Sequence, residues 1–114
     1  MIFDLKNEAE AIIPSFKGGE KEFRAKIRDD GMNKILHGRL VPGATIGVHT
    51  HETDSEIIYF FSGSGHMLYD GKKEPVEAGV CHYCPAGHSH GMINDSDGDL
   101  IFFAVVPSGQ KAPR

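Results

Sequence analysis

Several features that mark other protein classes are missing from this sequence of 114 residues. No apolar run approaches the ~20 residues that a membrane-spanning helix needs, so no membrane partner is expected. The 12 basic residues are outnumbered by 16 acidic ones and form no stripe, which argues against a nucleic-acid partner. The first residues also lack the basic and then apolar pattern of a signal peptide, so a cytoplasmic location is the expectation.

Cysteine is scarce as well. Two residues, Cys81 and Cys84, are too few for a disulfide scaffold. Their C-x-x-C spacing suggests zinc or redox chemistry, but a zinc ribbon needs a second pair and a redox motif usually begins a helix. This segment has the pattern of a strand, on which residues three apart point to opposite faces. Both thiols are therefore expected to be small packing groups.

Helical periodicity is also rare, because no long segment beyond residue 20 shows it. Short β-rich runs alternate instead with turn residues, among which the 14 glycines stand out. Asp70-Gly71 between two such runs is typical of a type I′ hairpin turn. The pattern predicts an all-β domain, either an antiparallel barrel or a sandwich. The expected strands cover residues 21–28, 33–41, 44–51, 55–62, 65–70, 73–77, 80–84, 90–94 and 99–106.

The length fits a single domain. We expect a β-barrel over residues 17–108, preceded by a segment over 1–16 and followed by a tail over 109–114. In the first segment Asn7 could cap a short helix that ends at Pro14. An arm that packs across the barrel or onto a second subunit fits the same residues equally well.

Histidines and one glutamate are placed where their side chains can meet. His49 and His51 are two residues apart near the end of an expected strand, so both rings can lie on one face. Glu56 begins the next strand, and antiparallel pairing of the two strands would bring it beside the histidine pair. His90 begins a later strand, after the turn Pro85-Ala86-Gly87. These four residues form a candidate metal site, whereas the other histidines at 37, 66 and 82 are expected to be surface or core residues.

Three imidazoles and one carboxylate suit a divalent first-row ion: Mn, Fe, Co, Ni, Cu or Zn. On a six-coordinate ion they leave about two positions for water or substrate. Structural zinc sites are usually closed by four ligands, so the open set is typical of a reactive centre.

The same residues lie in two motifs that resemble those of the cupin family. The first consists of a glycine, the His-x-His pair, a glutamate and a second glycine, and the second contains a glycine, Pro-x-Gly, a histidine and an asparagine. In this sequence the ten motif positions are Gly43, His49, His51, Glu56, Gly63, Gly79, Pro85, Gly87, His90 and Asn94.

This resemblance implies a conical double-stranded β-helix (a jelly roll) of two facing sheets. It also implies metal binding at the four positions named above, and commonly a homodimer. Asn94 is expected to fix the turn after its strand through side-chain to backbone hydrogen bonds. Gly63-Ser64-Gly65 is interpreted as a hairpin turn.

The leading functional hypothesis is a metal-dependent enzyme that acts on a small carboxylate or sugar acid, which would chelate the ion. His88, two residues before His90, is the candidate acid–base residue. The resemblance extends to small oxalate-decarboxylase-like cupins, but the arginine that those decarboxylases place shortly before the first metal histidine is missing here. Arg39 is the nearest upstream arginine. The alternative is a non-catalytic metal- and ligand-binding module.

Overall fold

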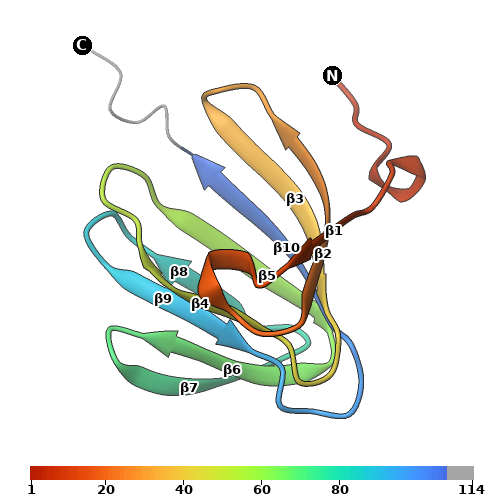
Figure 1. The fold of residues 1–114 in the computed structure, drawn as a ribbon. Coiled ribbons are helices and arrows are strands. Elements are labelled where there is room, and N and C mark those ends of the chain that lie inside the picture. Colours follow the sequence, from red (N-terminus) through yellow and green to blue (C-terminus); the bar gives the residue numbers. More distant parts are fainter. Residues whose placement is uncertain (108–114) are drawn as a thin grey trace.

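The fold consists of two antiparallel β-sheets that face each other (Figure 1). It was obtained as a computed structural model and is described for residues 1–107. One sheet has six strands in the order β1-β2-β3-β10-β5-β8, and the other has four in the order β4-β9-β6-β7. This is the double-stranded β-helix that the sequence predicts. The strands are β1 (Ala11–Pro14), β2 (Glu22–Asp29), β3 (Asn33–Leu40), β4 (Thr45–Thr50), β5 (Glu56–Ser62), β6 (Ser64–Tyr69), β7 (Lys72–Glu77), β8 (Cys81–Cys84), β9 (Ser89–Ile93) and β10 (Leu100–Pro107).

The core lies between the two sheets because the strands alternate apolar and more polar residues. In β10 every second residue is buried, beginning with Leu100 and Phe102. Met67 and Met92 contribute from the opposite sheet. The two cysteines follow the same rule, since Cys84 is buried and Cys81 is exposed, and both are free thiols.

All nine strands expected from the sequence are present, and each boundary lies within one residue of the expected one. The predicted hairpin turn between β6 and β7 is also confirmed. Its two central residues, Asp70 and Gly71, have φ angles of 48° and 83°, as a type I′ turn requires.

The interpretation of Gly63-Ser64-Gly65 as a hairpin turn is wrong. β5 and β6 lie in different sheets, so the chain crosses from one layer to the other at Gly63. This residue has a φ of 88°, and a Cβ there would lie 2.3 Å from the carbonyl oxygen of Asp99. Glycine is therefore needed for a close crossing between the layers.

The N-terminal segment is an arm that joins the sheet of its own chain. A short 3-10 turn, η1 (Leu5–Asn7), ends at Asn7, the residue that caps a short helix in one of the two alternatives left open by the sequence. Strand β1 then pairs with β2 at the edge of the larger sheet, and Pro14 ends it. A second 3-10 turn, η2 (Phe16–Gly18), follows and packs against β4.

Two further observations concern the chain as a whole. Among the described residues, no helix has the length and apolar character needed to span a membrane. The expected tail at 109–114 lies outside the described residues, and the domain boundaries at 16 and 108 stay predictions.

Candidate metal centre

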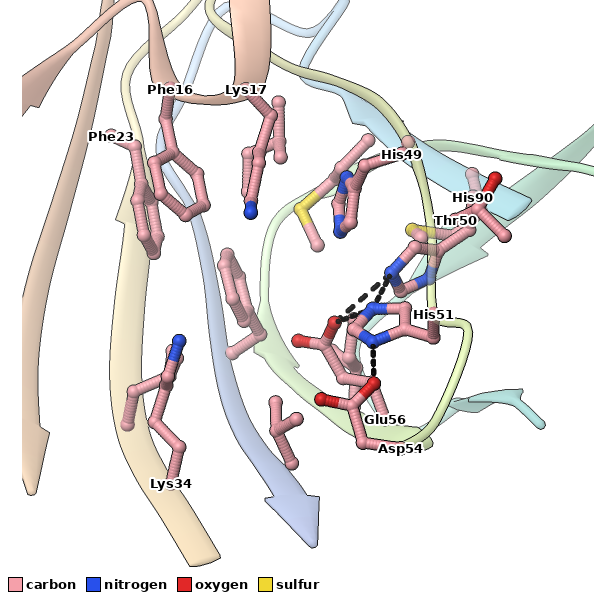
Figure 2. A pocket seen from close by; sticks show the side chains of 18 residues that line it. Phe16, Lys17, Phe23, Lys34, His49, Thr50, His51, Asp54, Glu56 and His90 are labelled. Carbon is pink, nitrogen blue, oxygen red and sulfur yellow. Dashed lines mark hydrogen bonds and ion pairs between the residues drawn. The ribbon is translucent and has the colours of Figure 1, made fainter. Parts of the chain in front are cut away.

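Four predicted side chains converge at one end of the space between the sheets (Figure 2). One possible donor atom from each of them lies within 4.8 Å of the other three. His49 is on β4 and His90 is on β9, directly opposite it in the strand register. His51 follows the end of β4, where its backbone N–H donates to the carbonyl oxygen of His88 at 3.1 Å. Glu56 is the first residue of β5.

The sequence-based reason for placing Glu56 here is wrong, although the residue does reach the cluster. β4 and β5 do not pair, because β4 pairs with β9 and β5 belongs to the other sheet. Glu56 therefore approaches the histidines across the gap between the layers. The cluster takes three residues from the β4–β9 side and one from the opposite sheet.

Three of the donor atoms form a tight triangle. The Nε2 atoms of His51 and His90 are 2.9 Å apart, and each lies 3.0 Å from Oε1 of Glu56. Adjacent ligands of an octahedral ion with bonds of about 2.1 Å are separated by about 3.0 Å. The donor spacing therefore fits a six-coordinate ion.

The outer nitrogen of each ring has its own partner. Nδ1 of His49 donates to the carbonyl oxygen of Gly47 at 2.8 Å, and Nδ1 of His51 donates to Oδ1 of Asp54 at 2.7 Å. These acceptors place the proton on Nδ1 and leave the Nε2 lone pair free for the centre. Nδ1 of His90 lies 3.0 Å from Nε2 of His82, a buried ring that the sequence did not connect with the site.

The electrostatics favour the protonation states that metal binding needs at Glu56 and His49, but not at His51. Burial alone would raise the pKa of Glu56, but hydrogen bonds with His51 and His90 lower it to about 2. Burial lowers the pKa of His49, which keeps that ring neutral. The pKa of His51 is raised, chiefly by its hydrogen bond with Glu56, so a metal ion would compete with a proton there. The residues present therefore could hold a metal ion.

A cavity of about 190 Å³ opens in front of the cluster. Its walls are mainly apolar, from both sheets and from η2. Two lysines, Lys17 and Lys34, also line it, and Figure 2 shows their side chains projecting into it from opposite sides. Neither was predicted. Strand alternation could have revealed Lys34, which shares the inward face of β3 with Leu36, whereas Lys17 carries no comparable signal. The apolar part of the wall includes Phe16, Phe23, Ile46, Ile58, Met92 and Phe102.

His88 and Arg39 are placed elsewhere. His88 does not line this cavity in the described part of the chain, and its Nδ1 lies 2.5 Å from Oδ2 of Asp70 and 3.2 Å from the hydroxyl of Tyr69. Its catalytic role stays a prediction. The guanidinium of Arg39 forms ion pairs of 2.8 Å with Glu10 and with Asp99, so it does not supply the missing pocket arginine.

Asn94 has the role that the resemblance implies. Its side chain is fully buried, and Nδ2 donates to the carbonyl oxygens of Leu40 and Gly98 at 2.8 Å each. Its Oδ1 accepts from the backbone N–H of Ser96 at 3.1 Å. These bonds fix the turn between β9 and β10, and so the end of the strand that carries His90.

Comparison with known proteins identifies the family. The model of the cupin domain matches residues 36–106, which include all four residues of the cluster. The chain belongs to the cupin family. Among relatives of this cupin is an oxalate-binding protein of Thermotoga maritima. It is 38% identical over 100 residues, which cover 82% of this chain and 83% of the relative.

Solved structures agree with the observed fold. A protein of Thermotoga maritima described as a predicted oxalate decarboxylase superposes on this cupin with a TM-score of 0.89 and 27% identity, covering 95% of this chain and 99% of that one. An RmlC-like cupin from Shewanella frigidimarina gives a TM-score of 0.76 over 96% and 91% of the two chains. Its identity is 16%, so it supports the fold alone.

Proposed function

We propose that this cupin binds one divalent transition-metal ion through His49, His51, Glu56 and His90. The observation that carries this proposal is the triangle of donor atoms with separations of 2.9 to 3.0 Å. Lone pairs this close repel one another unless a cation or proton lies between them. The donor set suits Mn, Fe, Co, Ni, Cu or Zn.

We further propose that the ligand is a small carboxylate that chelates the ion, and that the protein is an enzyme acting on it. Four protein donors leave about two positions of a six-coordinate ion open, which is typical of catalytic sites. The oxalate-binding relative supports a carboxylate ligand. When bound, the ion would supply Lewis-acid chemistry. The chain itself lines the site with partly apolar walls and orients His51 through Asp54.

A non-catalytic binding module is the second candidate. One observation favours it: within residues 1–107, each histidine or carboxyl group that lines the cavity either belongs to the cluster or is hydrogen-bonded to it. His49, His51, Glu56 and His90 form the cluster, and Asp54 accepts a hydrogen bond from His51. An enzyme would then need a lysine or the ion itself to move protons.

Calorimetric titration of metal-loaded protein with oxalate tests the binding proposal. We expect heat that fits binding at a single site. The Glu56→Gln variant should give no heat, because it removes the carboxylate that binds the metal ion. Absence of heat with metal-loaded wild-type protein would contradict carboxylate binding.

Turnover assays on carboxylates and sugar acids, in air and without oxygen, would separate the two candidates. Oxygen uptake would indicate a dioxygenase, and turnover without oxygen would indicate a lyase, decarboxylase or isomerase. The His88→Ala variant belongs in the same assay. Undiminished turnover at equal metal content would remove His88 from the mechanism.

We also propose a homodimer formed through the outer face of the larger sheet. Exposed apolar side chains gather there on β5 and β8, namely Ile57, Tyr59, Phe61 and Tyr83, and Ile57 is paired with Tyr83 in the register. Light scattering should give twice the chain mass, and the Phe61→Glu variant should give a monomer. A monomeric wild-type protein at micromolar concentration would contradict the dimer. The cytoplasmic location stays a prediction.

A further inference from the structure

We propose that Lys17 and Lys34 form a second anchor for the ligand, which binds a carboxylate distant from the chelating end. The preferred ligand is then a dicarboxylic acid longer than oxalate. This inference rests on the proposed metal-dependent carboxylate binding and names the class of ligand.

Lys34 occupies a position where a core residue would be expected. It shares the inward face of β3 with Leu36 and Leu40, and it lies opposite Val106 of β10 in the strand register. Figure 2 shows its ammonium group directed into the cavity. In the described part of the chain this group forms no ion pair and no side-chain hydrogen bond. Lys34 is half-buried, so its ammonium group has lost part of its contact with water and an anion in the cavity would stabilise it.

Lys17 reaches the same cavity from the N-terminal arm. Its backbone is left-handed, with a φ of 55°, which is uncommon for a residue with a side chain. Such a conformation costs on the order of 1 kcal/mol and persists where the surroundings enforce it. Within residues 1–107 its ammonium group has no ion pair either, although it lies 5.6 Å from the ring centre of Phe16.

The arm is held firmly against the strand that carries His49. A Cβ on Gly47 of β4 would lie 1.9 Å from the carbonyl oxygen of Lys17, so only glycine allows this approach. Just after η2, the backbone N–H of Glu20 donates to Oγ1 of Thr45 at 2.7 Å, and the N–H of Thr45 donates to the carbonyl of Glu20 at 2.9 Å. The backbone of Lys17 is thus fixed relative to the metal cluster, whereas its side chain is exposed.

The charges that line the cavity favour a dianionic ligand. The charged side chains that line the cavity are Lys17, Lys34, Asp54 and Glu56. Two ammonium groups and a divalent ion against two carboxylates leave two positive charges, which a dicarboxylate would balance. The volume of about 190 Å³ is roughly that of six water molecules in the liquid, so the cavity has room for a small dicarboxylic acid.

Calorimetry with two matched acids tests the second anchor. Lactate and malate share the 2-hydroxy acid that chelates a metal, and malate adds a carboxylate on the next carbon. We expect metal-loaded wild-type protein to bind malate about tenfold more tightly than lactate, because ammonium groups in a partly apolar cavity stabilise the added charge. This preference should weaken as salt rises, since salt screens the charges.

The variants Lys17→Gln and Lys34→Gln should each weaken malate binding by about three- to tenfold and leave lactate binding within about twofold. Lys72→Gln is the matched control. Lys72 is exposed on β7, so this substitution removes the same charge away from the cavity. Circular dichroism and metal content establish that each variant is folded and loaded.

The outcomes separate the two proposals. If wild-type protein binds both acids equally and neither lysine variant changes malate binding, the second anchor is overturned while the carboxylate-binding site stands. If metal-loaded protein binds neither acid, carboxylate binding fails and the second anchor fails with it. If Lys72→Gln weakens malate binding as much as the cavity variants do, the effect is general electrostatics and the anchor is again overturned.

Discussion

Replacing Asp54 by asparagine isolates the hydrogen bond that orients His51. In the wild-type protein, Oδ1 of Asp54 accepts the Nδ1 proton of His51 at 2.7 Å, and the carboxylate is about 29% exposed. An asparagine has nearly the same shape but no charge. Its oxygen would accept the same proton more weakly, and its NH₂ group would instead favour the tautomer that places the proton on Nε2. Both arrangements weaken the lone pair that faces the centre.

The magnitude follows from the kind of bond that is lost. A hydrogen bond to a charged group contributes about 1.5 to 3 kcal/mol when it is buried, and the partial exposure of Asp54 places the loss at the lower end. A loss of ~1.4 kcal/mol corresponds to a tenfold weaker metal affinity. Loss of a partner that orients a metal-binding histidine typically has an effect of this size or larger.

Competition with a chelator of known affinity measures this change for a chosen ion such as Mn or Zn. Asp97→Asn is the matched control, because Asp97 lies on an exposed loop and the substitution removes the same charge. Equal metal affinities for Asp54→Asn and wild-type protein would refute the role of this hydrogen bond. Equal losses in both variants would show that net charge, and not orientation of His51, sets the affinity.

Three further predictions concern stability. Burial, and then the neighbouring His90, lower the pKa of His82 from 6.5 to about 4. Metal-free protein should therefore lose up to ~3 kcal/mol of unfolding free energy as pH falls from 6.5 to 4. Urea titrations should show a flatter dependence of stability on pH for His82→Gln than for wild-type protein, and identical dependences would contradict the prediction. Gly47→Ala should destabilise the protein by about 2 kcal/mol or more, because the added carbon meets the carbonyl oxygen of Lys17 at 1.9 Å. Gly98→Ala is the control, because a Cβ there has no heavy atom within 4 Å, and it should be nearly neutral in the same urea titration. Asn94→Ala should cost about 3 kcal/mol, since two carbonyl oxygens lose their buried donor, and a thermal melt close to that of wild type would count against this account.

Local patterns in the sequence predicted the strands well, because alternation and turn chemistry act over a few residues. Asp70 and Gly71 sit in the turn that their residue types favour, and the nine expected strands are found. The edge strand β1 was not predicted. Ala11–Pro14 is short and mostly exposed, so its conformation depends on pairing with β2 and not on its own pattern.

Long-range pairing was the part that sequence spacing did not supply. The motif spacing brought Glu56 to the right place in the prediction, but through a β4–β5 pair that does not exist. Neighbours in the sequence need not be neighbours in a jelly roll, where the chain repeatedly crosses between layers. The acceptors Asp54 and Gly47 depend on three-dimensional orientation and could not be assigned from spacing.

Because η2 packs on β4, the residues that would hold the metal ion and the residue proposed to select the ligand come from different parts of the chain. The residues of the cluster all lie between positions 49 and 90, whereas Lys17 comes from an arm that enters the larger sheet only through its edge strand. Under the proposed second anchor, exchanging residues of that arm would alter which acids bind while the donor atoms stay where they are. Laboratory evolution for a new acid would do best to begin by randomising the arm, starting with the position of Lys17.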